Sequence, residues 1–456
     1  MSLSAEEKSL VDAILAAPDD DGPRQVYADW LTGKGDARGE FITLQCRLAA
    51  SKDDEARRKL RIAENKLLKA HAAEWSRELQ GVARSLIPHR PAKVEFHRGL
   101  LEEVDLPLDQ LGELDPLFEA APFLRRLRVD SPAVVGDPLP PPSLEGRLAS
   151  PHLARVMSLD LRLAAAGDAA ALELAACPYL KNLRVLHLLA SAWPVPGYLV
   201  FSGPPDSHLL TAAGAKALAS SPHLRGLREL NLGGNALGPP GVEAIVGADW
   251  KLESLDLSGN QLDDAALQAI ASSTHLGHLT TLRLGGGAFG PVGLRALAGA
   301  AKALPALTSL AFDGSQLGAK GLEAFLGALT LPKLTALGLT NTQQGDDGAK
   351  VIAKSKAVLQ LTDLELGDNR VTQDGVFALC DSPHVSSLER LKLNDAWLWK
   401  KAVTEKLLAS QSLARCRVYV KGSLLGRSEK PEKAEKPAKK AAAKKPAAAK
   451  KPAKKK

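Results

Sequence analysis

The amino-acid sequence predicts an α/β solenoid: a curved stack of short units with parallel strands on its concave side and helices on its convex side. Two observations support this. The phrase L-x-x-L-x-L-x-x-N-x-L occurs at residues 227–237 and again, 25 residues later, at 252–262. Self-similarity at this period is typical of stacked strand-and-helix units rather than of a compact globule. A small all-α domain before the stack and a disordered basic tail after it complete the prediction.

Further copies of the phrase predict the number and the positions of the units. Taking the first leucine as the start, clear units begin at residues 183, 227, 252, 279, 307, 334, 361 and 388. Weaker copies begin at Leu101, Leu124 and Val156. With a closing strand at 413–420, about twelve units are expected between residues 79 and 424.

Each unit combines two hydrophobic periods. The alternation in L-x-x-L-x-L is the period of two of a strand with one buried face. Further along each unit, segments such as 241–245 and 321–325 repeat apolar residues at the i, i+3 and i+4 spacing of a helix. One unit cannot bury both faces by itself, so neighbouring units must stack.

Residues 1–78 are predicted to form the small all-α domain. Ser4 and Glu7 make a capping-box pattern at the start of a first helix, and Pro23 suits the first turn of a second. A third helix and a charged fourth helix are expected to follow. The acidic run at 19–21 is interpreted as helix capping rather than as a metal site.

Two strings in this segment carry a resemblance. D-D-G-P-R-Q-V-Y-A-D-W-L at 20–31 and G-D-A-R-G-E-F-I at 35–42 resemble the repeat-companion domain that stands beside leucine-rich repeats in planctomycete and myxobacterial proteins. The resemblance implies a bacterial protein in which this domain precedes repeats. It implies no biochemical role.

The units from residue 79 to 424 resemble the leucine-rich repeat family. Their period and their G-x-x-A-L helices are similar to the ribonuclease-inhibitor-like class and to bacterial repeats of the G-A-L-A type. The resemblance implies an internal hydrogen-bond ladder built by the asparagine after each strand. The matching residues are Asn235, Asn260 and Asn369. Other residues stand at this position in four units, where the ladder is expected to be interrupted and the turns looser: Gly287, Ser315, Thr342 and Ala396.

Strand residues that point away from the core are expected to form the concave face, which solenoids present to their partners. Here they mix both charges with Ser and Thr, a composition that suits a protein partner better than a polyanion. A merely solvated sheet face is the alternative. The candidate contact residues are Arg228, Asn231, Glu253, Asp256, Arg283, Asp363, Glu365, Arg390 and Lys392.

An insertion provides a second candidate contact. The units that begin at 183 and 227 are 44 residues apart, so an extra loop of about 17 residues is expected on one face of the array. Its aromatic residues Trp193, Tyr198 and Phe201 would either anchor a partner or pack onto the flank of the repeats.

The net charge of +7 comes from the C-terminal tail. Residues 429–456 hold 12 Lys and 3 Glu, a charge of +9, which leaves −2 for residues 1–428. A Lys-, Ala- and Pro-rich composition of this kind, found over residues 425–456, predicts disorder and is similar to the tails of linker-histone-like proteins. The tail would either bind nucleic-acid phosphates without sequence preference or act as a solubilising extension. The candidate phosphate contacts are Lys439, Lys440, Lys444, Lys445, Lys450 and Lys451.

No pattern indicates catalysis. The sequence has no G-x-S-x-G, no P-loop and no G-x-G-x-x-G in a strand–helix context, and the neighbouring His275 and His278 lack further metal ligands. Four separated cysteines are predicted to be small buried hydrophobes. We therefore expect a non-enzymatic scaffold for a protein partner, with no cofactor, metal or small-molecule substrate.

The expected location is the cytoplasm. No apolar run reaches the about 18–20 residues that span a bilayer, and the first residues lack the layout of a signal peptide.

Overall fold

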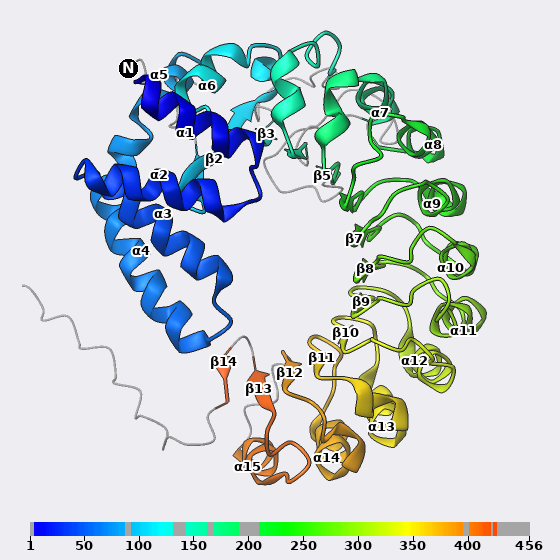
Figure 1. Ribbon diagram of the computed structural model, residues 1–456. Helices are drawn as coiled ribbons and strands as arrows, with labels where there is room; N and C mark the ends of the chain where they lie inside the picture. Colours follow the sequence, from blue (N-terminus) through cyan, green and yellow to red (C-terminus); the bar gives the residue numbers. More distant parts are fainter. Residues whose placement is uncertain are drawn as a thin grey trace, which may run out of the picture.

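The computed structural model describes residues 4–86, 93–130, 143–161, 167–190, 209–394, 401–420 and 423–425. The part of the chain that it describes contains one sheet of 14 strands, which follow one another in the order of the sequence. Strands line the inner side of a curved array and helices cover its outer side (Figure 1). This arrangement confirms the predicted α/β solenoid.

The strands are short, and most have three residues. Their bounds are β1 (Val94–His97), β2 (Leu100–Pro107), β3 (Arg126–Asp130), β4 (Ser158–Asp160), β5 (Val185–His187), β6 (Glu229–Asn231), β7 (Ser254–Asp256), β8 (Thr281–Arg283), β9 (Ser309–Ala311), β10 (Ala336–Gly338), β11 (Asp363–Glu365), β12 (Arg390–Leu393), β13 (Arg417–Val420) and β14 (Ser423–Leu424).

The first four helices are longer than those of the repeats. Their bounds are α1 (Ala5–Ala16), α2 (Asp21–Gly33), α3 (Ala37–Ala50), α4 (Asp54–Trp75), α5 (Arg77–Leu86), α6 (Asp115–Ala120), α7 (Gly167–Ala176), α8 (Ala212–Ser220), α9 (Gly238–Val246), α10 (Asp264–Ser272), α11 (Pro291–Ala298), α12 (Gly318–Gly327), α13 (Gly345–Lys354), α14 (Gln373–Asp381) and α15 (Lys401–Ala409). Short 3-10 helices are η1 (Leu108–Gly112), η2 (Pro151–Arg155), η3 (Pro178–Asn182), η5 (Lys356–Gln360) and η6 (Pro383–Val385).

Strands β2 to β13 pair in parallel, and each begins within four residues of a predicted start of a unit. The middle leucines of successive phrases lie opposite one another in the strand register: Leu230 pairs with Leu255, and Leu255 with Leu282. These leucines are almost fully buried. Both ends of the sheet differ from the prediction, because β1 and β14 pair antiparallel with their neighbours. Each terminal strand covers an edge that would otherwise be open to pairing.

The asparagine ladder is present as the resemblance implied. The side-chain nitrogen of Asn260 donates to the carbonyls of Leu232 (2.8 Å) and Leu257 (3.0 Å), and its side-chain oxygen accepts from the backbone nitrogen of Leu237 (3.3 Å). Asn260 thus joins two units through buried hydrogen bonds, which stabilise because both partners are removed from water.

The expected interruption is wrong at two of the substituted positions. The hydroxyl of Ser315 accepts from the backbone nitrogen of Gly287 (3.1 Å) and donates to the carbonyl of Leu284 (3.2 Å). The hydroxyl of Thr342 donates to the carbonyl of Leu339 in its own unit (2.7 Å) and contacts the side-chain oxygen of Asn369 in the next unit (3.2 Å). Both residues are fully buried. A hydroxyl can donate one hydrogen bond and accept others, so it takes the place of the asparagine amide here. Ala396 lies outside the described residues.

Gly287 is the position where the ladder lacks a side chain. A Cβ atom there would lie 2.2 Å from the ring of Phe289. The ring therefore occupies the space that the side chain would take, and the turn stays closely packed.

An aspartate clasp, which the sequence analysis missed, joins the helices of some units. Asp168, Asp264 and Asp346 stand at the same place in the first turns of α7, α10 and α13. Each accepts from backbone nitrogens at the start of the next helix: Asp168 from Thr211 (2.8 Å), Asp264 from Gly290 (2.6 Å) and Asp346 from Thr372 (2.7 Å). A carboxylate at a helix N-terminus is also favoured by the helix dipole.

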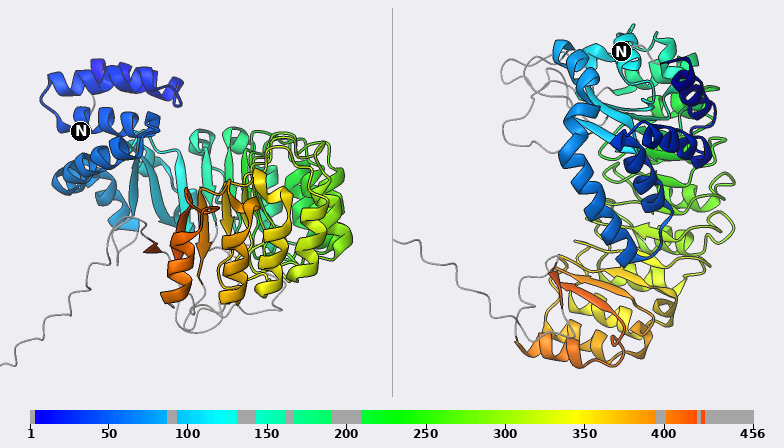
Figure 2. Two further views of the ribbon diagram at one scale, coloured as in Figure 1. Left: turned by 90° about the horizontal axis from the view of Figure 1, so that it is seen from below. Right: turned by 60° about the vertical axis from the view of Figure 1, so that its left-hand side comes forward.

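The N-terminal helices lie beyond one rim of the solenoid, beside its first strands (Figure 2). The predicted cap is present, because the hydroxyl of Ser4 accepts from the backbone nitrogen of Glu7 (3.1 Å). The core of this helical part includes Ile14, Leu31 and Ile42, and it also contains Leu100 of β2. The helices and the first hairpin therefore share a core.

A buried ion network fastens these helices to the repeats. The guanidinium of Arg24 on α2 lies 2.6 Å from the carboxylate of Glu102 on β2, and both side chains are 1 % exposed. Arg125 binds the other oxygen of Glu102 at 2.7 Å. Asp19, between α1 and α2, pairs with Arg184 next to β5 at 2.5 Å. This network fixes the orientation of the helical part on the solenoid.

The remaining expectations of the sequence concern cysteines and membranes. Cys46, Cys177, Cys380 and Cys416 are all buried and free, as predicted. Over the described ranges, no helix combines the length and the apolar composition that crossing a membrane requires.

Candidate functional site

The concave face was the first candidate contact surface. The structure places all nine candidate residues there, on or directly before β6, β7, β8, β11 and β12. Their neighbours Leu230, Leu255, Leu364 and Leu391 point into the core, so these side chains point away from it. The pairing of the strands brings candidates together in adjacent rows, such as Asp363 beside Arg390 and Glu365 beside Lys392.

Eight of these nine residues pair with one another across neighbouring strands. Arg228 lies 3.8 Å from Glu253, and Arg283 lies 3.9 Å from Asp256. Ion pairs also join Arg390 to Asp363 and Lys392 to Glu365. The ninth, Asn231, accepts from the backbone nitrogen of Gly233 at 2.9 Å. These charges are therefore already neutralised, and exposed pairs of this kind contribute little energy.

The first strands carry a second group of paired charges that the candidates did not include. Arg128 on β3 pairs with Glu103, with Asp105 (3.1 Å) and with Asp160 (3.7 Å). The group continues to His187 on β5. Alternation of sign from strand to strand makes this end of the concave face a continuous chain of ion pairs.

His187 is expected to make the stability of this chain depend on pH. The carboxylates of Asp160 (3.7 Å) and Glu229 (3.0 Å) raise its pKa from 6.5 to about 9. The pKa of His187 is higher in the folded state than in the unfolded state. The ion pairs of His187 therefore stabilise the fold fully below about pH 6.5, and this stabilisation is lost as the pH rises through about 9. We expect the free energy of unfolding to fall by about 2–3 kcal/mol across this window. Denaturant titrations of the wild type and of His187→Gln at several pH values measure it, and parallel curves would contradict it.

The middle of the concave face has a different composition. We define the central floor as Thr281, Ser309, Ala311, Ala336 and Gly338, which project from β8, β9 and β10 between the charged groups. These residues are uncharged and small. A Cβ atom on Gly338 would lie 2.9 Å from the Cβ of Ala311, so the floor is low and closely packed there.

A row of threonines borders the central floor. The hydroxyl of Thr280 donates to the carbonyl of Glu253 (2.9 Å), and that of Thr308 donates to the carbonyl of Thr280 (3.0 Å). Thr335 repeats this contact with Thr308 (3.4 Å). These hydroxyls are hydrogen-bonded within the sheet, so the row presents mainly methyl groups and polar groups that already have a hydrogen-bond partner.

One group among the described residues has the spacing of metal ligands. Glu95, His97 and Glu103 each place a ligand atom within 4.8 Å of the others. His97 lies 2.9 Å from Glu103, and this hydrogen bond lowers the pKa of Glu103. Arg128 also pairs with Glu103 and lies 3.8 Å from Glu95. Because these carboxylates already face cationic side chains, we interpret the group as part of the ion-pair chain.

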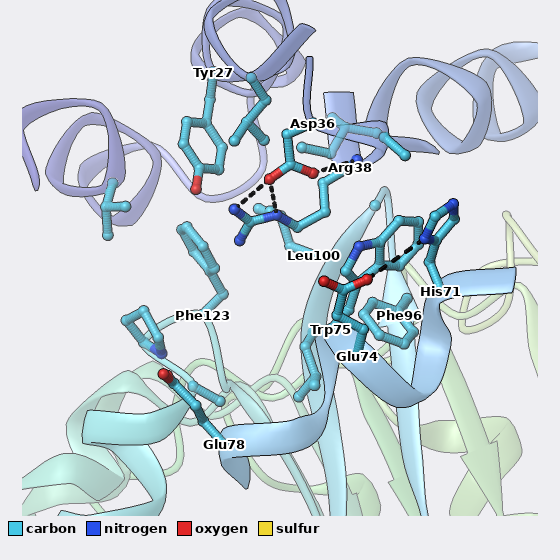
Figure 3. Close-up of a pocket in the computed structure, with 18 of the residues that line it drawn as sticks. Tyr27, Asp36, Arg38, His71, Glu74, Trp75, Glu78, Phe96, Leu100 and Phe123 are labelled. Carbon is cyan, nitrogen blue, oxygen red and sulfur yellow. Dashed lines mark hydrogen bonds and ion pairs between the residues drawn. The ribbon is translucent and has the colours of Figure 1, made fainter. Parts of the chain in front are cut away.

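A cleft of about 820 Å³ lies between the N-terminal helices and the first repeat. We call it the N-terminal cleft; its aromatic walls are Tyr27, Trp75, Phe96 and Phe123 (Figure 3). The sequence analysis missed it. Tyr27 is buried, and it lines the cleft. The walls come from segments far apart in the chain, so no local pattern could reveal the cleft.

Two hydrogen-bonded pairs of polar side chains enter the N-terminal cleft. The hydroxyl of Tyr27 donates to Glu7 at 2.9 Å, and burial together with Glu7 raises the pKa of Tyr27. The guanidinium of Arg38 binds one oxygen of Asp36 through Nε (2.8 Å) and Nη2 (2.6 Å). Although burial opposes it, these bonds hold the pKa of Asp36 below its usual value.

The remaining candidates from the sequence lie outside the described residues. These are the insert-loop residues Trp193, Tyr198 and Phe201 and the tail residues Lys439, Lys440, Lys444, Lys445, Lys450 and Lys451.

Comparison with known proteins supports the repeats. A family model described as "Leucine Rich repeat" matches residues 223–246, 251–271, 275–298 and 361–380, so the chain contains leucine-rich repeats. No curated protein is significantly similar to it.

Two solved structures are similar to this chain. One is the Rad7 and Elc1 complex of yeast, with 14% identity, a TM-score of 0.36, and 66% of this chain and 71% of that chain covered. The other is an internalin (inlF) from Listeria monocytogenes, with 15% identity, a TM-score of 0.36, and 76% of this chain and 90% of that chain covered.

Proposed function

We propose that this leucine-rich repeat protein is a non-enzymatic scaffold that binds a protein partner through the concave face of its solenoid. Leucine-rich repeat domains generally mediate protein–protein interaction, and their families are generally non-enzymatic. The observation that supports the proposal is the composition of the concave face. Its central floor is uncharged, and ion pairs flank it on both sides.

An uncharged centre with charges around it supports this proposal. Charged residues are depleted at the centre of protein interfaces and enriched at their polar, solvent-accessible rim. The small side chains of the central floor leave space for larger side chains of a partner, which carry most of the energy of an interface when they are fully desolvated. Paired charges on the flanks favour correct orientation and association rate over affinity.

The candidate residues then differ in their expected contribution to binding. The eight paired charges become rim residues, whose removal should have small effects, whereas the central floor becomes the expected centre of contact. The cytoplasmic location, the repeat-companion type of the N-terminal domain, the bacterial origin and the domain boundaries at 78 and 424 remain predictions that accompany this proposal.

A bulky charge on the central floor is expected to weaken binding. Ala336→Arg places a long cation in the uncharged centre, where it fills the space expected for the partner's side chains and its charge must be desolvated on binding, so the dissociation constant should rise about 10- to 100-fold. Lys392→Ala, on the rim, should change it less than about threefold. The partner is identified by affinity capture and mass spectrometry with the wild-type chain, and the affinities are then measured by calorimetry.

The matched control for this test is Ala265→Arg, which adds the same side chain to an exposed position on α10 of the convex side. It should bind like the wild type. If Ala265→Arg abolished binding while Ala336→Arg did not, the partner would contact the convex side and the proposal would be wrong.

We propose a second candidate function, nonspecific nucleic-acid binding by the tail, from the +9 charge of residues 429–456. Lysines that neutralise phosphates release counterions, so such binding weakens steeply with salt. A chain that ends at Ser428 should lose salt-sensitive retention on immobilised DNA, and the folded part should keep its unfolding midpoint. Retention that persists after the truncation would exclude the tail as the DNA-binding segment.

A further inference from the structure

The N-terminal cleft has no role in the proposed function, yet it has the features of a ligand site. We propose that it binds a hydrophobic carboxylate, with the carboxylate on Arg38 and the apolar part against the aromatic walls. Free aromatic acids and the C-terminal residue of a peptide share this chemistry. The inference is independent of the concave face.

The aromatic walls form two pairs on opposite sides of the cleft. Trp75, at the end of α4, meets Phe96 of β1 with ring centroids 6.0 Å apart, and Tyr27 of α2 meets Phe123 at 6.2 Å. The volume of about 820 Å³ lies within the range of sites for small ligands, which are mostly apolar with a few convergent polar groups. Aromatic walls of this kind suit a ring or a branched aliphatic chain.

Arg38 is the polar group that the cleft presents to an anion. Asp36 occupies Nε and Nη2, and Asp36 also accepts from the backbone nitrogen of Arg38 at 2.8 Å. The guanidinium is thereby held with its Nη1 end directed into the cleft, toward Phe123 (Figure 3). A guanidinium offers five donors in a planar fork, so one carboxylate can bind its side while a second binds its end.

The walls are rigid before any ligand binds. The β1–β2 turn packs on α3 so closely that a Cβ atom at Gly99 would lie 2.2 Å from the Cα of Ile42. The backbone nitrogen of Gly99 also donates to Gln45 at 2.5 Å. The buried pair of Arg24 and Glu102 holds α2 to the same hairpin. A preformed site saves the ordering cost that a flexible one incurs on binding.

Charged side chains of both signs line the cleft: Glu7, Asp36, Glu74 and Glu78, and Lys34, Arg38 and Arg77. Two of the carboxylates are already engaged, because Glu7 accepts from Tyr27 and Asp36 accepts from Arg38. Glu74 is 64% exposed and pairs with His71 at 3.6 Å, so it belongs to the mouth of the cleft rather than to its aromatic interior. A ligand cation between the aromatic rings would meet the guanidinium of Arg38, whereas a carboxylate would be attracted to it.

Ligand-observed NMR with the full chain tests the inference. The probes are N-acetylphenylalanine, its amide, and phenethylamine as the cationic counterpart. We expect N-acetylphenylalanine to bind at least about tenfold more tightly than the other two, because a hydrogen bond to a charged group is lost in them. Preference for the amine, or no binding by any probe, would overturn the proposal.

Two variants and one control locate the binding. Arg38→Gln removes the guanidinium and should weaken binding about 10- to 100-fold. Ala120→Trp leaves Arg38 intact and fills the cleft from the end of α6, so it should abolish binding; it also serves if Arg38→Gln does not fold. Arg295→Gln, on the exposed side of α11, should bind like the wild type. Unchanged binding in the folded cleft variants would place the probe elsewhere and reject the assignment.

A second pair of probes distinguishes a peptide C-terminus from a free aromatic acid as the ligand. A hexapeptide that ends in phenylalanine is compared with its C-terminally amidated form. Tighter binding of the free-acid peptide than of N-acetylphenylalanine supports a peptide C-terminus as the ligand. Equal or weaker binding supports a free aromatic acid.

Discussion

Glu102→Gln is expected to lower the free energy of unfolding by about 3–5 kcal/mol. The carboxylate of Glu102 is 1% exposed and binds Arg24 and Arg125 at 2.6 and 2.7 Å. The amide keeps the shape but removes the charge, so two buried guanidinium groups lose their common counter-charge. Urea titration of the full chain measures the loss. Because the network joins the helical part to the repeats, the titration should also resolve an earlier transition of residues 4–86.

Two further variants control this prediction. Glu389→Gln, at an exposed position directly before β12, should change the free energy of unfolding by less than about 0.5 kcal/mol. Replacing Arg24, Glu102 and Arg125 together by Met, Leu and Met should recover much of the loss, since an apolar replacement of a buried ion network is often neutral or stabilising. A loss below about 1 kcal/mol for Glu102→Gln would mean that water reaches the network.

Phe312→Ala is expected to cost about 3–5 kcal/mol and to divide the solenoid into two unfolding units. Phe312 is fully buried, and its ring packs edge-on against Phe289 (5.8 Å) of the preceding unit and against Phe325 (5.5 Å) of its own unit. The alanine would leave a cavity at a junction in the middle of the array. Denaturation followed by hydrogen exchange should then show the two halves losing protection at different denaturant concentrations.

The control for the cavity is Phe377→Ala on α14. Phe377 is only partly buried and has Lys406 over its ring at 5.7 Å, so its loss should cost clearly less than that of Phe312. A single cooperative transition in Phe312→Ala, with a midpoint close to that of the wild type, would show that the junction repacks around the cavity.

The positions of the strands could be predicted from the sequence because they depend on a period. Units expected to begin at Leu227 and Leu252 give β6 and β7 two residues later. Even the weak copy at Val156 gives β4. The second N-terminal helix has Pro23 in its first turn, as predicted. It begins at Asp21, because Asp20 accepts from the backbone nitrogen of Gly22 at 2.8 Å and so caps it.

The features that could not be predicted depend on contacts between distant residues. Glu102 and Arg24 are 78 positions apart, and no pattern in either neighbourhood marks a buried pair. The charges of the concave face were interpreted as free contacts, because their self-pairing depends on the register between strands. Ser315 was interpreted as a break in the ladder, because residue type alone does not show that its hydroxyl bonds two backbone groups of the preceding unit.

The aspartate clasp has a mechanical consequence. The residue that follows the turn into each helix is aspartate at Asp168, Asp264 and Asp346, whereas Pro239, Pro291 and Ala319 occupy the same place in α9, α11 and α12. A tensile load applied to the two ends of the array passes through all junctions in series, so the least reinforced junction opens first. Rupture should therefore begin at a junction that lacks the clasp, either between α9 and α10 or, in the units that carry the central floor, between α11 and α13.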